Sequence, residues 1–415
     1  MGRRFGWLWA AYSVSALGTY LAFDAFSVIA VVALHAGSAE VALLAASGPA
    51  VGALAAVPLG PWVEFRRKRP VMMAMDLVRF GALLTVPAAY ALGLLGLGQL
   101  LLVSVVTAAA DITFNAASGA FLKGLVPADR LLTANARFES TNWTALVLGP
   151  PLGGAAIGLF GPVTTVTANA VSFLLSALGI RAVGAGEPRP GPTGGDRLRA
   201  ADLLHGWRHI LGSPALRPLF FNNLAGNALI MVAVPPLAVL MLGRLGFTPW
   251  QYGLAFAVPC LGGLLGARLA RPLVARHGQL RVLRAAATLR AVWPVGLALV
   301  RPGAAGLLLV MVLEFGVITC SAVYSPVYAT RRLEHIPNDR IARTLSAWSI
   351  TGKATTAALT ALWGLLASVT GPRTAIALAG VLLLATPLLL PREPATERPS
   401  PATVPPSPDG SPQSR

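Results

Sequence analysis

Residues 60–80 read GPWVEFRRKRPVMMAMDLVRF and place four consecutive cations, Arg66 to Arg69, between two long apolar runs. Charge is scarce elsewhere, since charged residues make up 12% of the 415-residue chain and hydrophobic residues make up 55%. A helix needs about 20 consecutive apolar residues to cross the hydrocarbon core of a bilayer, and both flanking runs have this length. The cations therefore mark a loop between two membrane spans, and the composition predicts an all-α polytopic membrane protein embedded in a lipid bilayer.

Twelve transmembrane helices are predicted when the apolar runs are split at charge clusters and at Gly/Pro turns. Very short turns, such as Gly96-Leu97-Gly98, make neighbouring helices antiparallel. The first run is too long for a signal-peptide core and carries Asp24, so we interpret it as a retained helix. The expected spans are residues 6–33, 40–63, 71–95, 98–122, 133–160, 162–183, 216–242, 250–271, 280–300, 304–330, 342–369 and 372–391.

The cations are distributed unevenly between the two sides of these spans. With the N-terminus inside the cell, 26 of the 33 Lys and Arg residues fall in cytoplasmic segments and three fall outside. Cytoplasmic loops of membrane proteins carry such an excess, so both termini are predicted to be cytoplasmic. The Arg-, Ala-, Gly- and Pro-rich composition is typical of a bacterial genome rich in GC, which indicates the bacterial plasma membrane. The formal net charge of +17 then needs no nucleic-acid partner, because no soluble basic face is present.

An internal repeat divides the chain. VPADR at residues 126–130 matches IPNDR at residues 336–340, and Gly161-Pro162 matches Gly371-Pro372 at the same separation of 210 residues. With six spans on each side of one long loop, these matches predict two pseudo-symmetric six-helix bundles with the substrate site between them. The predicted domains are the N-terminal bundle 1–183, a cytoplasmic linker 184–215 with a short amphipathic helix, the C-terminal bundle 216–391, and a disordered cytoplasmic tail 392–415.

At this point the chain resembles the major facilitator superfamily, and more narrowly its bacterial branch of drug and siderophore exporters. The opening stretch is similar to the signature loop G-x-L-A-D-R-x-G-R-[KR], with Gly60, Glu64, Lys68 and Arg69 at matching positions and Phe65 and Arg67 as departures. The stretch ALVLGPPLGG, residues 145–154, resembles the helix-5 signature of antiporters. The matching residues are Gly149, Pro150, Gly153 and Gly154.

The resemblance implies the fold and the working cycle. It implies the major facilitator fold, transport of a small molecule by alternating access, function as a monomer, and a central cavity lined by helices 1, 4, 7 and 10. It also implies that the loop after helix 2 latches the two bundles together. Topology anchoring explains the four cations of this loop equally well, but it gives no role to Glu64.

Several charges lie inside the predicted spans, where each costs about 2.5–3.5 kcal/mol on insertion scales and therefore needs a partner or a function. Asp76 and Arg79 are three residues apart on one helix and can pair. Together with Arg137 and Glu139 of helix 5, they are predicted to form a cytoplasmic gate with the loop after helix 2.

Three acids are candidates for proton coupling. Asp111 and Glu314 lie near the middle of helices 4 and 10, and Asp24 lies further out along helix 1. A carboxylate in such a cavity can alternate between protonated and ionised forms, as transport driven by a proton gradient requires. We prefer Asp111, then Asp24 and Glu314, while a permanent ion pair between Glu314 and Lys353 is the structural alternative.

Amides within the spans are candidates for contacts with the substrate or for hydrogen bonds between helices. Polar residues expected to line the cavity are Asn115, Asn222, Asn223, Asn227 and Lys353. The sequence contains no G-x4-G-K-[ST], G-x-S-x-G or H-E-x-x-H motif, and we expect neither a cofactor, a metal site nor an enzymatic activity.

The sequence thus predicts a secondary active exporter of an amphipathic small molecule, such as a drug, siderophore or secondary metabolite, working in antiport with protons. One alternative is an uptake symporter on the same fold. A second is a membrane scaffold or sensor that does not transport.

Overall fold

The computed structural model describes residues 2–22, 24–64, 66–127, 130–184, 200–337 and 340–390. Within these ranges the chain forms helices and no strand. The α-helices are α1 (Arg3–Leu21), α2 (Ala25–Val32), α3 (Ser38–Glu64), α4 (Lys68–Ala91), α5 (Leu97–Leu125), α6 (Leu131–Phe160), α7 (Pro162–Ala182), α8 (Ala200–Gly212), α9 (Leu216–Met231), α10 (Val234–Ala238), α11 (Pro249–Ala257), α12 (Cys260–His277), α13 (Gln279–Val292), α14 (Ala304–Glu334), α15 (Ile341–Thr370) and α16 (Pro372–Ala385).

Some membrane crossings consist of more than one helix. The segments Arg3–Val32 and Pro249–His277 each join two helices, and a π-helical turn extends Leu216–Met231 to Arg244. In the described part of the chain, nine helical segments are long and apolar enough to span a membrane. Helices α3, α6 and α15 complete the set with 27, 30 and 30 residues. The arrangement is consistent with the twelve predicted spans.

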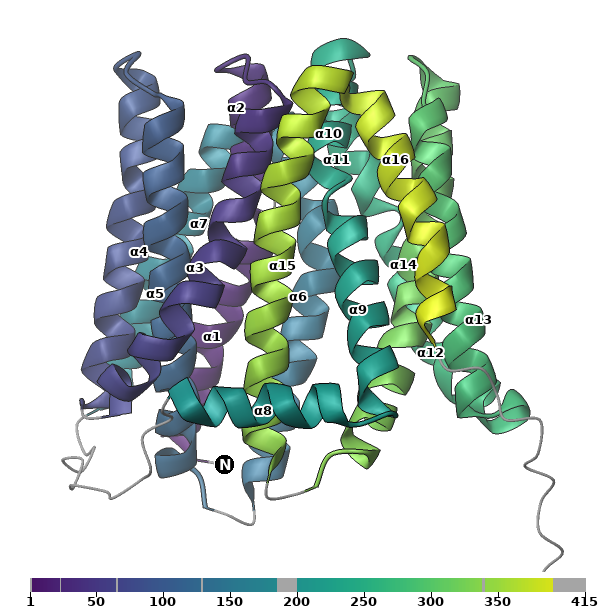
Figure 1. The fold of residues 1–415 in the computed structure, drawn as a ribbon. Coiled ribbons are helices and arrows are strands. Elements are labelled where there is room, and N and C mark those ends of the chain that lie inside the picture. The colour runs from purple at the N-terminus through teal and green to yellow at the C-terminus, as the bar shows by residue number, and fades with distance from the viewer. Residues whose placement is uncertain are drawn as a thin grey trace, which may run out of the picture.

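The helices form two groups with α8 lying across one end (Figure 1). In the first group α4 packs on α5 and α7, and α1 packs on α6 and α7. In the second group α14 packs on α12 and α13, and α16 packs on α9 and α15. The two groups meet chiefly where α3 contacts α15 and where α6 contacts α11. The N-terminus lies at the α8 end of the molecule.

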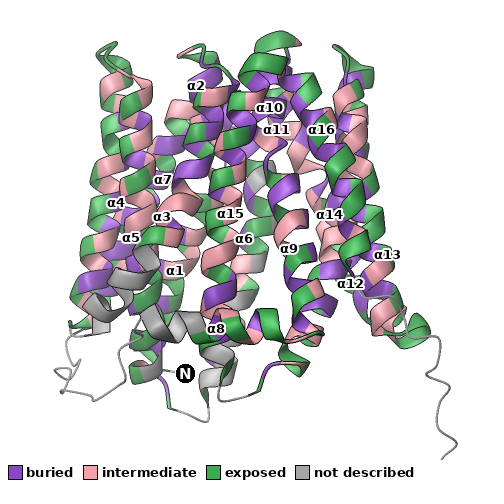
Figure 2. Ribbon diagram, viewed as in Figure 1, coloured by how far each residue is buried: buried purple, intermediate pink, exposed green. Residues whose placement is uncertain are grey.

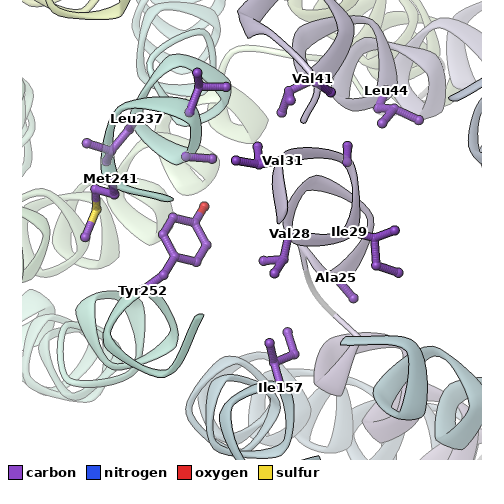
Figure 3. Close-up of a cluster of buried hydrophobic side chains, with 14 of the residues drawn as sticks. Ala25, Val28, Ile29, Val31, Val41, Leu44, Ile157, Leu237, Met241 and Tyr252 are labelled. Carbon is purple, nitrogen blue, oxygen red and sulfur yellow. The ribbon is translucent and has the colours of Figure 1, made fainter. Parts of the chain in front are cut away.

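At the end opposite α8, both groups contribute to a single buried apolar cluster (Figure 3). Val28 and Ile29 of α2 belong to it together with Leu237 of α10 and Met241 of the π-helical turn, and all four are at most 1% exposed. Apolar side chains of the two groups bury each other in this cluster. The two groups therefore cannot separate here without exposing apolar surface to water.

At the α8 end, the described buried residues instead fall into two clusters, one in each group. Phe5, Met72 and Leu122 belong to the cluster of the first group. Leu219 and Trp348 belong to the cluster of the second group, which also includes Ile210 of α8. The bundles are therefore packed together at one end and carry separate cores at the other.

The outer flanks expose large apolar side chains, which is expected where helices face lipid (Figure 2). Val369 is 86% exposed, Leu388 is 78% exposed and Leu92 is 72% exposed. The repeat seen in the sequence has a structural counterpart, since α6 and α15 each have 30 residues and each ends at a glycine with positive φ followed by proline. Positive φ is readily adopted by glycine, which allows the chain to reverse within one residue.

The contact between α6 and α11 depends on glycines. A Cβ on Gly154 would collide with the backbone of Gly253, so the two helices approach as closely as main chains allow. We expect Gly154→Val to lower stability by about 1–3 kcal/mol through overpacking, seen as a lower unfolding temperature in detergent. Gly81→Val is the matched control, because nothing lies within 4 Å of a Cβ at Gly81. Equal unfolding temperatures for the two variants would contradict the close contact.

Candidate functional site

The first membrane crossing is interrupted at Asp24. Helix α1 ends at Leu21 and α2 begins at Ala25, and Asp24 between them has φ 62°, in the left-handed region. Residues other than glycine rarely adopt this conformation, although Asp tolerates it better than most. The break places Asp24 at the N-terminus of α2.

The carboxylate of Asp24 bridges the two bundles. Tyr252 of α11 is 4% exposed and donates its hydroxyl hydrogen to Oδ2 of Asp24. Glu314 of α14 also interacts electrostatically with Tyr252 and with Cys260. The buried phenol therefore bonds to a carboxylate of the first bundle and lies within electrostatic range of a carboxylate of its own bundle.

Neither Asp24 nor Glu314 has a cationic partner among the described residues. A charged carboxylate in apolar surroundings is costly unless it is paired. The alternative ion pair between Glu314 and Lys353 does not form, because Lys353 lies instead against Gly52 of α3.

Asp111, the acid preferred from the sequence, belongs to a different cluster. Arg79 donates to Asp76 at 2.5 Å from Nη2 and to Asp111 at 3.0 Å from Nη1. The guanidinium group lies between two aromatic rings, 4.6 Å from the centroid of Phe114 and 4.2 Å from that of Phe173. The structure therefore contains the predicted pair of Asp76 and Arg79 and adds Asp111 to it.

Asp111 is the exposed member of this cluster. Arg79 is 4% exposed and Asp76 is fully buried, whereas the side chain of Asp111 is 53% exposed. Asp111 also accepts a hydrogen bond from the exposed Asn115 at 2.9 Å. Its role in proton coupling stays a prediction.

The three asparagines of α9 occupy different environments. Asn222 is fully buried, donates to the carbonyl of Thr386 at 2.7 Å and accepts from the hydroxyl of Tyr324 at 2.8 Å. These bonds identify it as a link between helices. Asn223 is partly buried and Asn227 is exposed, so the two keep their predicted availability for a substrate.

The structure describes the side chains of only some residues of the predicted gate. The side chains of Gly60, Glu64 and Glu139 lie outside the described residues. Arg69 donates to the carbonyls of Ile180 and Arg181 at 3.1 and 2.7 Å, so it joins α4 to the end of α7 within one bundle. Lys68 donates to the carbonyl of Arg66, and Arg137 is exposed with its guanidinium 6.0 Å from the ring centroid of Phe5. The role of these residues as a latch between bundles stays a prediction.

The glycines of the antiporter-like stretch allow α6 to pack closely against two other helices, α1 and α11. A Cβ at Gly149 or Gly153 would collide with Tyr20 or Leu21 of α1. Gly154 faces the opposite bundle, and the side chain of Pro150 lies outside the described residues. Helix α6 therefore connects the first membrane crossing to α11.

Sequence reasoning did not identify Tyr252. Its hydroxyl group in an otherwise apolar segment was a signal, but nothing in the sequence shows which acid it faces. Among the described residues, no group of three or more His, Cys, Asp or Glu side chains could hold a metal ion.

The family model of the Major Facilitator Superfamily matches residues 8–349. The chain belongs to this superfamily of membrane transporters. It is also 29% identical over 264 residues to the multidrug efflux pump Tap of Mycobacterium tuberculosis, and the same match is found in Mycobacterium bovis. The match covers 59% of this chain and 60% of the relative. The protein is thus a multi-pass membrane transporter with a distant relative among efflux pumps.

Solved structures share the fold at low identity. A POT family transporter in complex with a thioalcohol-conjugated peptide has a TM-score of 0.71 at 13% identity, covering 93% of this chain and 95% of the other. A bacterial homologue of the iron transporter ferroportin is 18% identical in two states. Its inward-facing state has a TM-score of 0.69, with 93% of this chain and 98% of the other covered. Its outward-facing state has a TM-score of 0.57, with 94% and 98% covered.

Removing the cation of the Arg79 cluster tests how much this cluster stabilises the folded protein. Arg79→Met leaves the fully buried Asp76 without its partner, so we expect a loss of about 3–5 kcal/mol in stability. The measurement is the unfolding temperature of the purified protein, with the exposed Arg301→Met as control. A variant as stable as the control would show that the cluster does not stabilise the fold.

Proposed function

We propose that the protein exports an amphipathic small molecule by alternating access and that inward movement of protons drives the export. The superfamily and the distant efflux pump support transport out of the cell. The proposed route lies between the bundles, where Asn115, Asn227 and Asp111 expose polar groups in the middle of long apolar helices. Polar groups in such positions ordinarily face the interior of a bundle rather than lipid.

The observation that carries the proposal is the pair of carboxylates around Tyr252 in the core that joins the bundles. Without cationic partners, Asp24 and Glu314 pack into this core at low cost only when they are protonated. Proton binding therefore favours closure of this end, and loss of the protons favours its opening. An antiporter needs this coupling. After it has released substrate and bound protons at this end, the protonated protein must close here and open towards the other side of the membrane, where it binds the next substrate molecule.

The direction of export follows from the distribution of cations. The excess of Lys and Arg supports a cytoplasmic position of the α8 end, and the end that the structure closes would then face outward. The higher TM-score with the inward-facing ferroportin homologue supports the same interpretation. Substrate would then enter from the cytoplasm and leave through the end that contains Asp24 and Tyr252.

Transport in proteoliposomes tests the role of the carboxylates. For wild type, we expect efflux of at least one member of a panel of lipophilic cations, neutral macrolides, siderophores and lipophilic carboxylates to rise with an inward proton gradient. Asp24→Asn combined with Glu314→Gln should reduce the gradient-driven rate at least 10-fold, because neither position can then bind or release a proton. Glu334→Gln, at an exposed acid near the α8 end, is the control.

Three results would contradict the proposal in different ways. Gradient-driven transport that persists in the double variant would assign coupling to another group. Substrate movement in the same direction as the protons would indicate an uptake symporter. The absence of transport for the whole panel, with the protein folded in the liposomes, would favour a scaffold or sensor.

A further inference from the structure

The C-terminal bundle buries an arginine that has no acid beside it. Arg290 of α13 is 2% exposed, and its guanidinium carbon lies 3.7 Å above the centroid of the Tyr324 ring. A Cβ on Gly226 of α9 would collide with Nη2 of Arg290, so the glycine provides the space that the guanidinium fills. The charge is thus placed between α9, α13 and α14.

The hydrogen bonds of this guanidinium are incomplete. Both Nε and Nη2 of Arg290 are buried and have no hydrogen-bond partner, and no ion pair to Arg290 is present among the described residues. Arg79, 211 residues earlier in the repeat, also has a buried Nε without a hydrogen-bond partner, but both of its terminal nitrogens are bonded. It contacts two carboxylates, and the first of these, Asp76, lies three residues before it. Ala287 lies three residues before Arg290.

Further unpaired donors follow the same face of α14 towards the α8 end. The rings of Tyr324 and Tyr328 stack with centroids 5.3 Å apart, and the guanidinium carbon of Arg332 lies 5.4 Å from the ring centroids of both Tyr328 and Trp348. Tyr328 Oη, Arg332 Nε and Trp348 Nε1 are buried without hydrogen-bond partners. All of these atoms can donate a hydrogen bond, and two of the side chains are cationic.

A buried cation and several buried donors without acceptors are unfavourable unless something supplies negatively charged oxygen atoms. Arginine is well suited to this role because its planar group binds carboxylate or phosphate oxygens through two parallel hydrogen bonds. The surrounding aromatic rings add a surface on which an apolar body can pack.

We propose that the transported molecule is an amphipathic anion whose carboxylate or phosphate group binds Arg290 and the adjoining donors of α14 and α15. This inference rests on the proposed function, since it names the substrate class of the same transporter. Asn227, one residue beyond Gly226, is exposed, and the proposed approach to Arg290 runs past it. Lys353 of α15 is an exposed cation in a membrane span of the same bundle.

The test compares lipophilic carboxylates with their neutral amides on the purified full-length protein. The probes are 1-naphthaleneacetate, dodecanoate and indole-3-acetate, each paired with its own amide, and binding is followed by tryptophan fluorescence and by thermal shift. We expect at least one carboxylate to bind at least 10-fold more tightly than its amide. Arg290→Gln should remove this difference, and Arg290→Lys should retain part of it. The exposed Arg301→Gln is the control and should leave the difference unchanged.

The outcomes separate this inference from the proposed function. If no carboxylate binds more tightly than its amide, or if the preference survives in folded Arg290→Gln, the anion site is refuted. Proton-driven transport of cationic or neutral probes by the same variant would leave the proposed function intact. If Arg290→Gln fails to fold, the Arg290→Lys variant provides the test. Lysine cannot bind a carboxylate through two parallel hydrogen bonds, so an unchanged preference for the carboxylate over its amide would refute the proposed role of the guanidinium.

Discussion

The structure depends on a hydrophobic core that the described residues of the two bundles share at the end opposite α8. Tyr252 lies in this core among apolar side chains of both bundles (Figure 3). Its hydroxyl group donates a hydrogen bond to Asp24 of the other bundle. At the α8 end each bundle has its own core. Opening the joined end exposes apolar surface and separates the phenol from the carboxylate. The second of these costs depends on whether the carboxylate carries a proton.

The intramembrane charges are treated differently in the two bundles. In the N-terminal bundle, Arg79 is surrounded by two carboxylates and two aromatic rings, so its charge is neutralised within the cluster. In the C-terminal bundle, the matching Arg290 has an aromatic ring and no carboxylate. Both halves of the repeat therefore contain the buried arginine, but they differ in the groups that neutralise its charge. Such divergence fits a transporter in which one half contributes stability and the other provides the contact with an anionic substrate.

Much of the fold could be predicted because the bilayer restricts the possibilities. Apolar runs of sufficient length must be helices, and the cation-rich stretch 66–69 lies at the junction of two of them, with Lys68 and Arg69 opening α4. The pair of Asp76 and Arg79 was also predictable, since helical spacing fixes which residues share a face. Contacts between distant helices were not. Nothing in the sequence links Asp24 to Tyr252 or Asp111 to Arg79, because these contacts depend on how the helices pack. The break at Asp24 also follows from a backbone conformation that no local sequence signal requires.

The most direct test of the account is to measure distances between spin labels at both ends of the same molecule. One pair at Arg67 and Arg276 reports on the α8 end, and a second pair at Leu94 and Leu299 reports on the opposite end, all four positions being exposed. Cys260 and Cys320 are first replaced by alanine. The account predicts that raising the pH lengthens the Leu94–Leu299 distance and shortens the Arg67–Arg276 distance. Distances that stay fixed, or that lengthen together, would contradict alternating closure around the shared core.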